Sequence, residues 1–397
     1  MSADPATVAI TDVAEVNPPL KASRPPASAR VSFIPMADVS DSGEWVNKQS
    51  RHLGEIGAGY TPFQEHDILF AKITPCMENG KGTFAVGLES GVGFGSTEFH
   101  VLRAKPGNQP RFVYHVTQWE ALRRKAESMM IGSAGQQRVA AEFFSRFRIP
   151  RLDGDQQHQI ADILDAADAA IRQTGALISK LRWMKTGLLH DLLTRGLDEQ
   201  GRLREPVAHP KQFRECTLGE LTPLRRDRGY PGLPTMAVTM YDGLLPRNTH
   251  DRRVETRLLP EQHLLARKGD IAYNMMRMWQ GACGLADEDC LLSPAYVVVV
   301  PTGVVPAFAY LLFKLPDTIQ KFHNRSRGLT DDRLRLYHRD FARIVVRIPR
   351  SLSEQQAIVD VVQAHDARIR AEEAYRDKLK LQKRGLMNDL LTGWVRV

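Results

Sequence analysis

The sequence has few cysteines and no long apolar run. Four cysteines in 397 residues cannot form a disulfide framework, so we expect a protein of the reducing cytoplasm. The longest apolar candidate, Ala295–Val300, has the length of a strand, whereas a membrane-spanning helix needs about 20 apolar residues. Met1–Val8 lacks a basic segment followed by an apolar one. We therefore expect neither secretion nor a membrane partner.

Familiar catalytic and metal-binding motifs are also missing. The sequence contains no G-x-S-x-G and no H-E-x-x-H motif. Cys283 and Cys290 have no neighbouring histidine pair, which does not fit a zinc site. Asn17–Leu20 resembles the Asn-Pro-Pro-aromatic motif of adenine-N6 methyltransferases, but leucine replaces the aromatic residue that would stack on a flipped base. We interpret it as a turn, and expect no catalytic residue and no metal site.

The positive charge is unevenly distributed. The chain carries 54 Lys and Arg against 46 Asp and Glu, a net charge of +8. Residues 1–198 are neutral, so the excess lies in the second half. Val101–Arg151 holds ten basic and three acidic residues, and Lys321–Arg350 holds nine and three. A single charged window is usually a solvated surface, but two matched, arginine-rich windows favour contacts with phosphates and guanine edges.

The chain repeats itself at an offset of 198 residues. Gln157–Thr194 and Gln355–Thr392 align without gaps, with 18 of 38 positions identical. The preceding regions match more faintly, as where Asp67-Ile68-Leu69 corresponds to Asp270-Ile271-Ala272. The plan is two diverged globular units, each followed by a nearly unchanged segment. We expect a first domain at 1–150, a helix at 151–198, a linker and second domain at 199–350, and a second helix at 351–397.

Heptad spacing of apolar residues in both repeated segments predicts two long helices. The predicted packing positions are Ile160, Leu164, Ile171, Leu181, Leu188, Leu192, Ile358, Val362, Ile369, Leu379, Leu386 and Leu390. Their near-identity suggests that the helices pack on each other, although two separate surface helices remain an alternative. Gly187 and Gly385 lie inside the pattern, where glycine costs about 1 kcal/mol relative to alanine, which suggests a close helix approach or a break.

The two globular units are predicted to be rich in β-strands. Short apolar runs bounded by Gly, Pro, Asn and Asp predict strands at Val31–Pro35, Asp67–Ile73, Gly82–Val86, Phe99–Leu102, Thr235–Val238, Asp270–Tyr273 and Tyr296–Val300. Helices are expected at Pro110–Ser128 and Ala307–His323. The predicted fold is α+β: two β-rich domains separated by two long helices that pack as an antiparallel coiled coil with pseudo-twofold symmetry. Such a molecule suits two DNA half-sites.

This architecture resembles the specificity subunit of type I restriction-modification systems. Gly59–Lys81 and Ser96–Phe99 are similar to one class of target-recognition domain in that family. The family's Glu-Gln-x-x-Ile helix opening stands here at Glu354–Ile358, with Gln156 in place of the glutamate in the first copy. The helix endings at Gly187–Thr194 and Gly385–Gly393 are similar as well. The second domain lacks the familiar central motif.

The resemblance implies a non-catalytic subunit that recognises a bipartite double-stranded DNA target and directs methylation and restriction by its partners. Two modification (methyltransferase) subunits would dock on the helices, which would set the gap between half-sites, and a restriction (motor and nuclease) subunit would join them. S-adenosylmethionine, ATP and Mg²⁺ would belong to these partners, so no cofactor is expected on this chain. Two alternatives remain: a nonspecific nucleic-acid-binding scaffold and a standalone enzyme.

Affinity is expected from the basic windows, and base recognition from polar, arginine and aromatic residues in loops. The candidate DNA-binding residues are Lys72, Thr74, Glu78, Asn79, Lys81, Arg123, Arg124, Lys125, Arg138, Arg225, Arg226, Arg228, Tyr273, Asn274, Arg277, Gln280, Arg325, Arg327, Arg333 and Arg335. For each residue that is expected to contact bases, the alternative is that it is an ordinary loop or strand residue with no role in recognition.

Overall fold

Two units divide the chain in the computed structural model, which describes residues 6–21, 25–57, 59–133, 135–206, 211–247, 258–330 and 333–395. Unit 1 comprises 1–175 and 373–397, and unit 2 comprises 176–372. The predicted linker therefore lies partly outside the described residues, at 207–210. The long helices α5 (Gly154–Arg195) and α10 (Leu352–Leu391) each contribute one part to each unit. Each unit thus contains one globular domain and a stretch of both helices.

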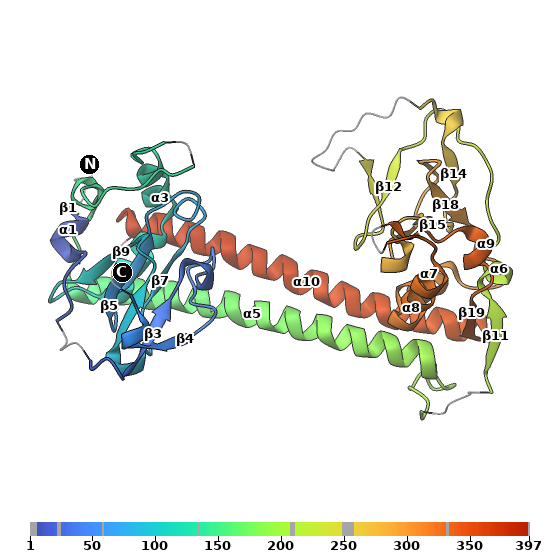
Figure 1. Cartoon of the computed structure of the whole chain (residues 1–397), viewed down its shortest axis with the longest axis horizontal. Helices are drawn as coiled ribbons and strands as arrows, with labels where there is room; N and C mark the ends of the chain where they lie inside the picture. Colours follow the sequence, from blue (N-terminus) through green and yellow to red (C-terminus); the bar gives the residue numbers. More distant parts are fainter. Residues whose placement is uncertain are drawn as a thin grey trace. The chain divides into compact units, whose positions relative to one another are not determined.

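Unit 1 combines three small sheets with short helices (Figure 1). Its strands are β1 (Thr7–Ala9), β2 (Ala14–Val16), β3 (Arg30–Ile34), β4 (Gln49–His52), β5 (Thr61–Gln64), β6 (Ile68–Ala71), β7 (Gly82–Phe84), β8 (Val92–Gly95), β9 (Phe99–Ala104) and β10 (Arg148–Pro150). Its helices are α1 (Ile10–Val13), η1 (Met36–Asp38), η2 (Leu53–Glu55), η3 (Glu89–Gly91), α2 (Pro110–Gln118), α3 (Glu120–Glu127) and α4 (Phe143–Arg146). The sheet orders are β2-β9-β6-β7, β4-β3-β8-β5 and β1-β10, in which only β3 and β8 pair in parallel.

Unit 2 repeats the plan with shorter sheets. Its strands are β11 (Phe213–Thr217), β12 (Met236–Val238), β13 (Leu244–Pro246), β14 (Leu264–Ala266), β15 (Ile271–Asn274), β16 (Cys283–Leu285), β17 (Cys290–Leu292), β18 (Tyr296–Val299) and β19 (Val345–Pro349). Its helices are α6 (Leu218–Leu221), η5 (Pro260–Gln262), η6 (Met278–Gln280), α7 (Pro306–Lys314), α8 (Pro316–Arg325) and α9 (His338–Phe341). The strand β15 is central, in the order β16-β15-β18, while β11-β19, β12-β13 and β14-β17 form pairs.

The helix predicted before each long helix is in fact two helices. In unit 2 the break falls at Leu315, which is extended because it precedes Pro316, a residue that disfavours a helical neighbour and begins α8. In unit 1 the break falls at Trp119, which is also extended although no proline follows it. The Trp119 ring is buried and its Nε1 donates to Asn388 of α10, so tertiary contacts fix this corner.

The faint match at Asp67 and Asp270 proves to be one turn built twice. In each turn the buried aspartate accepts a hydrogen bond from the backbone N–H three residues earlier, at 2.8 Å in unit 1 and 2.7 Å in unit 2. The preceding residue is left-handed in both, with φ 67° at His66 and 90° at Gly269. Each carboxylate also binds an arginine: Arg103 in unit 1 and Arg225 in unit 2. The diverged domains therefore share local structure as well as sequence order.

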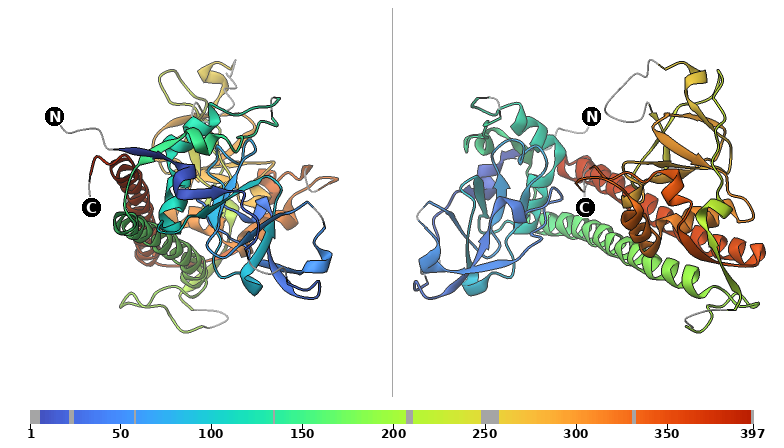
Figure 2. Two further views of the ribbon diagram at one scale, coloured as in Figure 1. Left: turned by 90° about the vertical axis from the view of Figure 1, so that its left-hand side faces the viewer. Right: turned by 45° about the vertical axis from the view of Figure 1, so that its right-hand side comes forward.

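Each domain core continues into the long helices, which run antiparallel within each unit. In unit 1 the cluster around α2 includes Ile160 and Leu164 from the start of α5 and Leu390 from the end of α10 (Figures 1 and 2). In unit 2 the cluster around α7 includes Leu192 from the end of α5 and Val362 from the start of α10. The expected antiparallel pairing of the two helices is confirmed within each unit.

The burial of the predicted packing positions follows the heptad pattern with one exception. Nearly all of these side chains are buried or half-buried, namely Ile160, Leu164, Ile171, Leu181, Leu188, Leu192, Ile358, Val362, Ile369, Leu379 and Leu390. Leu386 is instead 37% exposed, and Met387 is buried in its place. A straight helix drifts about 20° per heptad, so after four heptads from Ile358 the inward-facing position has moved by nearly one residue.

The two matched glycines also differ from expectation. Neither interrupts its helix, because α5 and α10 continue through Gly187 and Gly385. A Cβ atom added at either position would meet nothing within 4 Å. The prediction of a close approach between helices, or of a break, is therefore wrong for the chain alone. No described helix is both long and apolar enough to cross a membrane.

Candidate nucleic-acid interface

The first predicted recognition segment, 72–81, joins β6 to β7, and much of it is held by internal hydrogen bonds. The Thr74 hydroxyl donates to Glu78, while the Lys81 ammonium donates to two backbone carbonyls, at 3.2 Å and 2.8 Å. Lys72 is half-buried and Asn79 is exposed, and the side chain of neither has a hydrogen bond within the described residues. Lys72 and Asn79 therefore have free donors for a ligand. Thr74, Glu78 and Lys81 instead hold the segment in shape.

Arg123 supports this segment from inside the domain and corrects one prediction. Its side chain is only 6% exposed. It donates to the carbonyls of Thr117, Met77 and Lys81 at 2.7, 2.8 and 3.1 Å, and lies over the Phe70 ring. A buried guanidinium with three backbone acceptors cannot reach DNA, so Arg123 positions the 72–81 segment.

The other basic candidates of unit 1 are exposed. Arg124 forms an ion pair with Glu120, and Lys125 has no side-chain partner within the described residues. Arg138 pairs with Glu98 at 2.7 Å, and this hydrogen bond lowers the pKa of the Glu98 carboxyl. Glu98 belongs to the 96–99 stretch that follows β8, so the pair joins two candidate surface segments.

In unit 2 the first arginine cluster divides in the same way. Arg225 is half-buried, with ion pairs to Asp270 and Asp227 at 2.5 and 2.7 Å, and serves the repeated turn. Arg226 and Arg228 are exposed, and Arg228 donates to the carbonyl of Gln262 at 3.2 Å. Arg226 and Arg228 are thus the accessible members of this cluster.

Tyr273 is the second correction, because it belongs to the core of unit 2. The ring is fully buried on the central strand β15 and lies 5.1 Å from the Phe341 ring. The side chain of Asn274 accepts a hydrogen bond from the Met276 N–H and shapes the turn after the strand. Arg277 and Gln280 are exposed and bonded to each other at 3.1 Å. The accessible part of the predicted second recognition site is therefore this turn around η6.

The last group of candidates begins with the final residue of α8 and continues after it. Arg325, Arg327, Arg333 and Arg335 are all exposed. Arg327 forms an ion pair with Asp340 at 2.7 Å, and a β-bridge joins Arg327 to Arg335. These arginines keep most of their donors directed at solvent.

A pair of buried glutamines, which the sequence marked only as part of a helix opening, holds each domain on its helix. The Gln157 side chain accepts from the Gln109 N–H at 2.9 Å and donates to the Leu152 carbonyl at 3.1 Å. In unit 2 the Gln355 side chain accepts from the Val305 N–H at 2.9 Å and donates to the Pro349 carbonyl at 2.8 Å. Gln109 and Val305 are the residues that cap α2 and α7. The repeated glutamine therefore fixes the first helix of each domain's helix pair.

Two ion pairs between the long helices are also equivalent under the repeat. Asp168 binds Lys383 at 2.5 Å in unit 1, and Asp366 binds Lys185 at 2.5 Å in unit 2. Both pairs are partly shielded from solvent. They account for two of the polar positions in the apolar seam, because the lysines at 185 and 383 each face an aspartate on the other helix.

Unit 1 has one further junction that has no counterpart among the described residues of unit 2. Asp165 of α5 accepts hydrogen bonds from Arg111 and from buried His115 of α2, at 2.9 Å and 2.7 Å. Burial raises the pKa of the Asp165 carboxyl, but the hydrogen bonds from His115 and Arg111 outweigh it and hold that pKa well below its usual range. Burial lowers the pKa of His115, and the bond to Asp165 offsets only part of this shift. A polar network thus joins the first domain to α5.

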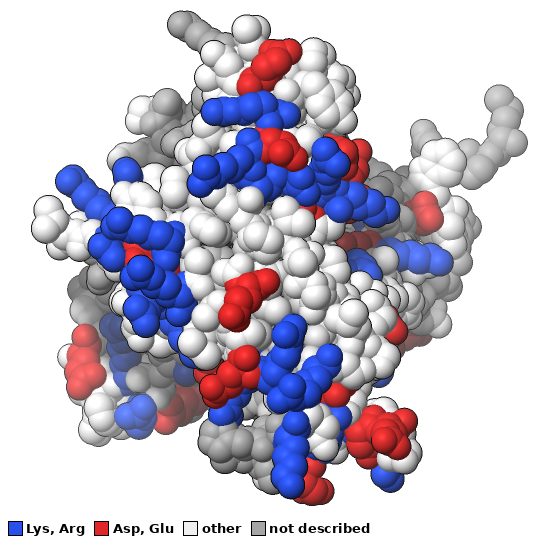
Figure 3. All heavy atoms as spheres, turned by 90° about the vertical axis from the view of Figure 1, so that its right-hand side faces the viewer, with Lys and Arg blue, Asp and Glu red and all other residues white. Residues whose placement is uncertain are grey.

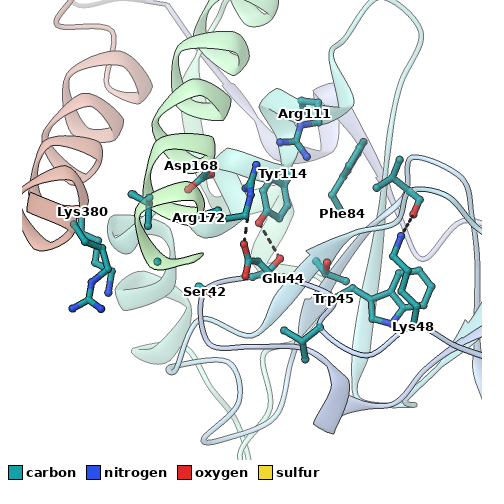
Figure 4. A pocket seen from close by; sticks show the side chains of 17 residues that line it. Ser42, Glu44, Trp45, Lys48, Phe84, Arg111, Tyr114, Asp168, Arg172 and Lys380 are labelled. Atoms are coloured by element: carbon teal, nitrogen blue, oxygen red, sulfur yellow. Dashed lines mark hydrogen bonds and ion pairs between the residues drawn. The ribbon is translucent and has the colours of Figure 1, made fainter. Parts of the chain in front are cut away.

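A cavity of about 770 Å³ lies beside this network in unit 1. Figure 4 shows the loop that carries Ser42, Glu44 and Trp45 facing Arg172 of α5, with Tyr114 beside Arg172. Glu44 lies 3.8 Å from Arg172, and the Tyr114 hydroxyl donates to the Gly43 carbonyl at 3.0 Å. Contacts between the first domain and α5 cross this cavity. In the described part of the chain, no group of three His, Cys, Asp or Glu side chains is placed to hold a metal ion.

The Asn17–Leu20 motif has a structural role. The Asn17 side chain accepts from the Val101 N–H at 3.0 Å and bonds the buried His100 ring at 3.1 Å. The Asn17 N–H donates to the Val101 carbonyl at 2.7 Å. The Asn17 amide therefore bonds through both its oxygen and its nitrogen in attaching this turn to β9, as expected from the turn interpretation.

Comparison with known proteins gives matches over part of the sequence and over the whole fold. Residues 4–182 match the family described as type I restriction modification DNA specificity domain. The chain is 36% identical over 156 residues to the EcoEI type I restriction enzyme specificity subunit of Escherichia coli, and 36% identical over 154 residues to the EcoAI one. Each match covers 38% of this chain but only 26% of the relative.

Solved structures match over nearly the full length. A chain from a type I restriction-modification system has a TM-score of 0.63 at 15% identity, and the match covers 98% of both chains. The S subunit from M. genitalium gives 0.52 at 14% identity over 97% of this chain and 96% of that one. The HsdS subunit from Thermoanaerobacter tengcongensis gives 0.50 at 15% over 100% and 98%. These likenesses show that the fold is shared.

Proposed function

We propose that this chain is a specificity subunit of a type I restriction-modification system, the non-catalytic subunit that recognises a bipartite DNA target for its partners; the match of residues 4–182 to the DNA specificity domain and the shared fold support this. One observation carries the proposal above the others. The two units share the aspartate turn, the glutamine contact and the inter-helix ion pair, yet their exposed candidate residues differ. An unchanged scaffold with two different surfaces is what recognition of two different half-sites requires.

Within this proposal the candidate contacts divide by chemistry. The exposed polar and arginine side chains around 72–79 and around η6 contact base edges, because these residue types match the donors and acceptors of the major groove. The exposed arginines after α3 and α8 neutralise phosphates, which gives affinity without sequence information.

The long helices have two proposed roles, as spacer and as docking site for modification subunits. Matched positions on the two helices leave large apolar side chains in solvent: Trp183 is 78% exposed and Leu381 is 66% exposed. One helical turn further on, the open glycines Gly187 and Gly385 leave room for a close neighbour. Two equivalent apolar spots beside glycines suit two copies of one partner. A restriction subunit completes the proposed assembly, and S-adenosylmethionine, ATP and Mg²⁺ belong to the partners.

The proposal is tested by assembling this chain with modification subunits of a type I system and mapping methylation on a genomic DNA library by sequencing. We expect methylated sites to share one asymmetric motif of two short parts separated by a fixed gap. A continuous palindrome would contradict the proposal. Methylation without a motif would favour the nonspecific scaffold, and methyl transfer by this chain alone would favour a standalone enzyme.

A further inference from the structure

Unit 2 has a second basic site, away from the predicted recognition turn. A groove of about 500 Å³ lies between α8, β11 and β19. Four cationic side chains line it: Lys321 and Arg325 from α8, Arg343 before β19, and Arg347 on β19. Its one acidic residue, Glu215, is already paired with Arg347 at 3.0 Å. The groove therefore carries a net charge of +3 from four cations and one anion.

The cations of this groove are held differently. Lys321 Nζ donates to the Val345 carbonyl at 3.0 Å, which fixes it across the groove. Arg325 and Arg343 are exposed, and neither guanidinium has a hydrogen bond or ion pair within the described residues. Two free guanidinium groups beside two tethered cations provide donors for an anion that comes from outside.

The groove shares a helix with the predicted base-recognition turn. On one side of α8, His323 lies 5.6 Å from the Trp279 ring of η6. Lys321 and Arg325 of the same helix line the groove on the other side. A ligand that contacts Arg277 and Gln280 at the turn can therefore continue across α8 to the groove. Figure 3 shows the face of unit 2 that carries β11 and β19, where Lys and Arg gather in separate groups with uncharged surface between them.

The repeat supplies an independent observation. The α3 and α8 helices place Lys125 of unit 1 at the position of Lys321, and the segments Phe147–Pro150 and Val346–Pro349 place Arg148 at that of Arg347. The Ile10 N–H at the start of α1 donates to the Phe147 carbonyl as the Leu218 N–H at the start of α6 donates to the Ile344 carbonyl, which places Arg146 at the position of Arg343. All three unit 1 residues are exposed. The two domains otherwise differ in most of their sequence, so retention of the same three charges favours one shared ligand chemistry. Met129 replaces Arg325 in unit 1, which makes unit 2 the stronger of the two sites.

We propose that this groove binds phosphate groups of the DNA duplex beside the half-site and supplies affinity without base recognition. The inference rests on the proposed DNA-recognition function. Arginine matches phosphate oxygens through its planar fork, and the groove exposes only one large apolar side chain, Val345. A protein partner would require apolar anchors at the centre of its interface, so the lining favours a duplex over an acidic protein surface.

The test uses the complete complex and a random-sequence 60-base-pair duplex, because phosphate binding does not depend on sequence. The double variant Arg325→Gln/Arg343→Gln removes the two free guanidinium groups. The slope of log affinity against log salt should become shallower by about 1.8, since each phosphate contact contributes about 0.9. At 0.1 M salt this corresponds to a loss of roughly 60-fold. The preference for target over random duplex should not change.

Two control variants make the result specific. Arg267→Gln/Lys268→Gln removes the same charge from an exposed turn of unit 2, and should leave the slope nearly as in the unmodified protein. Arg325→Lys/Arg343→Lys keeps the charge and should keep most of the slope. An unchanged slope in the Gln variant would overturn the inference. Loss of a partner subunit with an unchanged slope would overturn it as well, in favour of a protein-binding groove.

Failure of the proposed function has a different signature. If the unmodified complex binds every duplex equally but the Gln variant still lowers the slope, base recognition fails and the phosphate groove stands. If the unmodified complex binds no duplex, both proposals fall.

Discussion

Asp67 and Asp270 show how single buried side chains fix the same geometry in two diverged domains. Each carboxylate binds its own turn and one arginine, and each lies almost fully out of solvent. Removing one member of a buried ion pair leaves the other charge without a partner, which costs far more than losing a surface pair. The turn is therefore kept in both domains because the loss of either buried carboxylate would destabilise its domain.

The first prediction concerns Asp67→Asn. Arg103 loses a partner that now accepts two hydrogen bonds at 2.8 Å, so we expect the free energy of unfolding to fall by about 3–5 kcal/mol. Glu89→Gln is the matched control, because it breaks the exposed Arg30–Glu89 pair and should cost less than about 1 kcal/mol. Urea-induced unfolding measures both. Equal losses of unfolding free energy in the two variants would show that the buried pair stabilises the protein no more than the exposed pair does.

The second prediction is a loss of stability in mild acid. Burial lowers the pKa of His115 and of His100 in the folded protein, so the unfolded chain binds more protons as the pH falls below about 6.5. Stability is therefore present above this pH and is lost below it. By pH 5.5 each buried histidine should cost up to about 1.4 kcal/mol relative to pH 7.5.

Replacing His115 tests this assignment. His115→Leu introduces the residue found at the equivalent position 311 of unit 2, and should reduce the loss between pH 7.5 and 5.5 by about 1 kcal/mol. His158→Leu alters an exposed histidine and serves as the control. Unfolding in urea at the two pH values decides the matter, and identical pH dependence in the unmodified protein and the His115 variant would refute it.

At the scale of elements, α5 and α10 present two different surfaces. Their inward faces are continuous with the domain cores, whereas Trp183 and Leu381 remain exposed at equivalent positions. The two glycines that follow them cost helix stability, although a Cβ atom at either position would meet no atom of the described chain within 4 Å. Residues that weaken a monomer but recur in both copies are best explained by a contact outside it.

The third prediction is that Trp183→Ala and Leu381→Ala together weaken the binding of modification subunits. Apolar anchors of this size commonly contribute 2 kcal/mol or more, so we expect affinity to fall by roughly 30-fold or more. Since both side chains are exposed, the melting temperature of the chain alone should not decrease. Tyr241→Ala removes an exposed aromatic residue from a loop and should leave assembly intact. Calorimetric titration measures the affinity, and unchanged binding in the double variant would reject this docking site.

At the scale of the whole molecule, the plan was predictable and many contacts were not. The 198-residue repeat specifies two equivalent helices and two equivalent domains, because repetition is visible without any knowledge of packing. Charge windows cannot distinguish Arg123 from Arg124, although one is buried and the other exposed. The helical spacing of Trp119, Leu122, Arg123 and Ala126 could have placed Arg123 inside. Tyr273 was misjudged because its strand is central, and strand order depends on contacts distant in sequence.

The fourth prediction concerns the gap between half-sites. Deleting seven residues from each helix at equivalent positions, 173–179 and 371–377, keeps the heptad phase and shortens each helix by about 10 Å. If the helices set the gap, the preferred target should lose about three base pairs at 3.4 Å each. Sequencing of methylated sites measures the gap. The same deletion in α5 alone should abolish methylation by the assembled complex. An unchanged gap in the target of the double deletion would show that the helices do not set the gap.

The glutamine contacts have a consequence for how such a protein can change over time. Gln157 and Gln355 hold α2 and α7 through the N–H of a capping residue, and both donate to a carbonyl that precedes the long helix. Every residue except proline supplies both backbone groups, so the contacts that the two units share place little demand on the side chains of the domain, although Gln157 also donates to the Asn108 side chain at 2.9 Å. The glutamine contacts therefore allow a domain with a different binding surface to replace the present one, provided that it also preserves the packing of its core, of Trp119 and of His115 against the helices. New binding specificities then become accessible by exchange of whole domains.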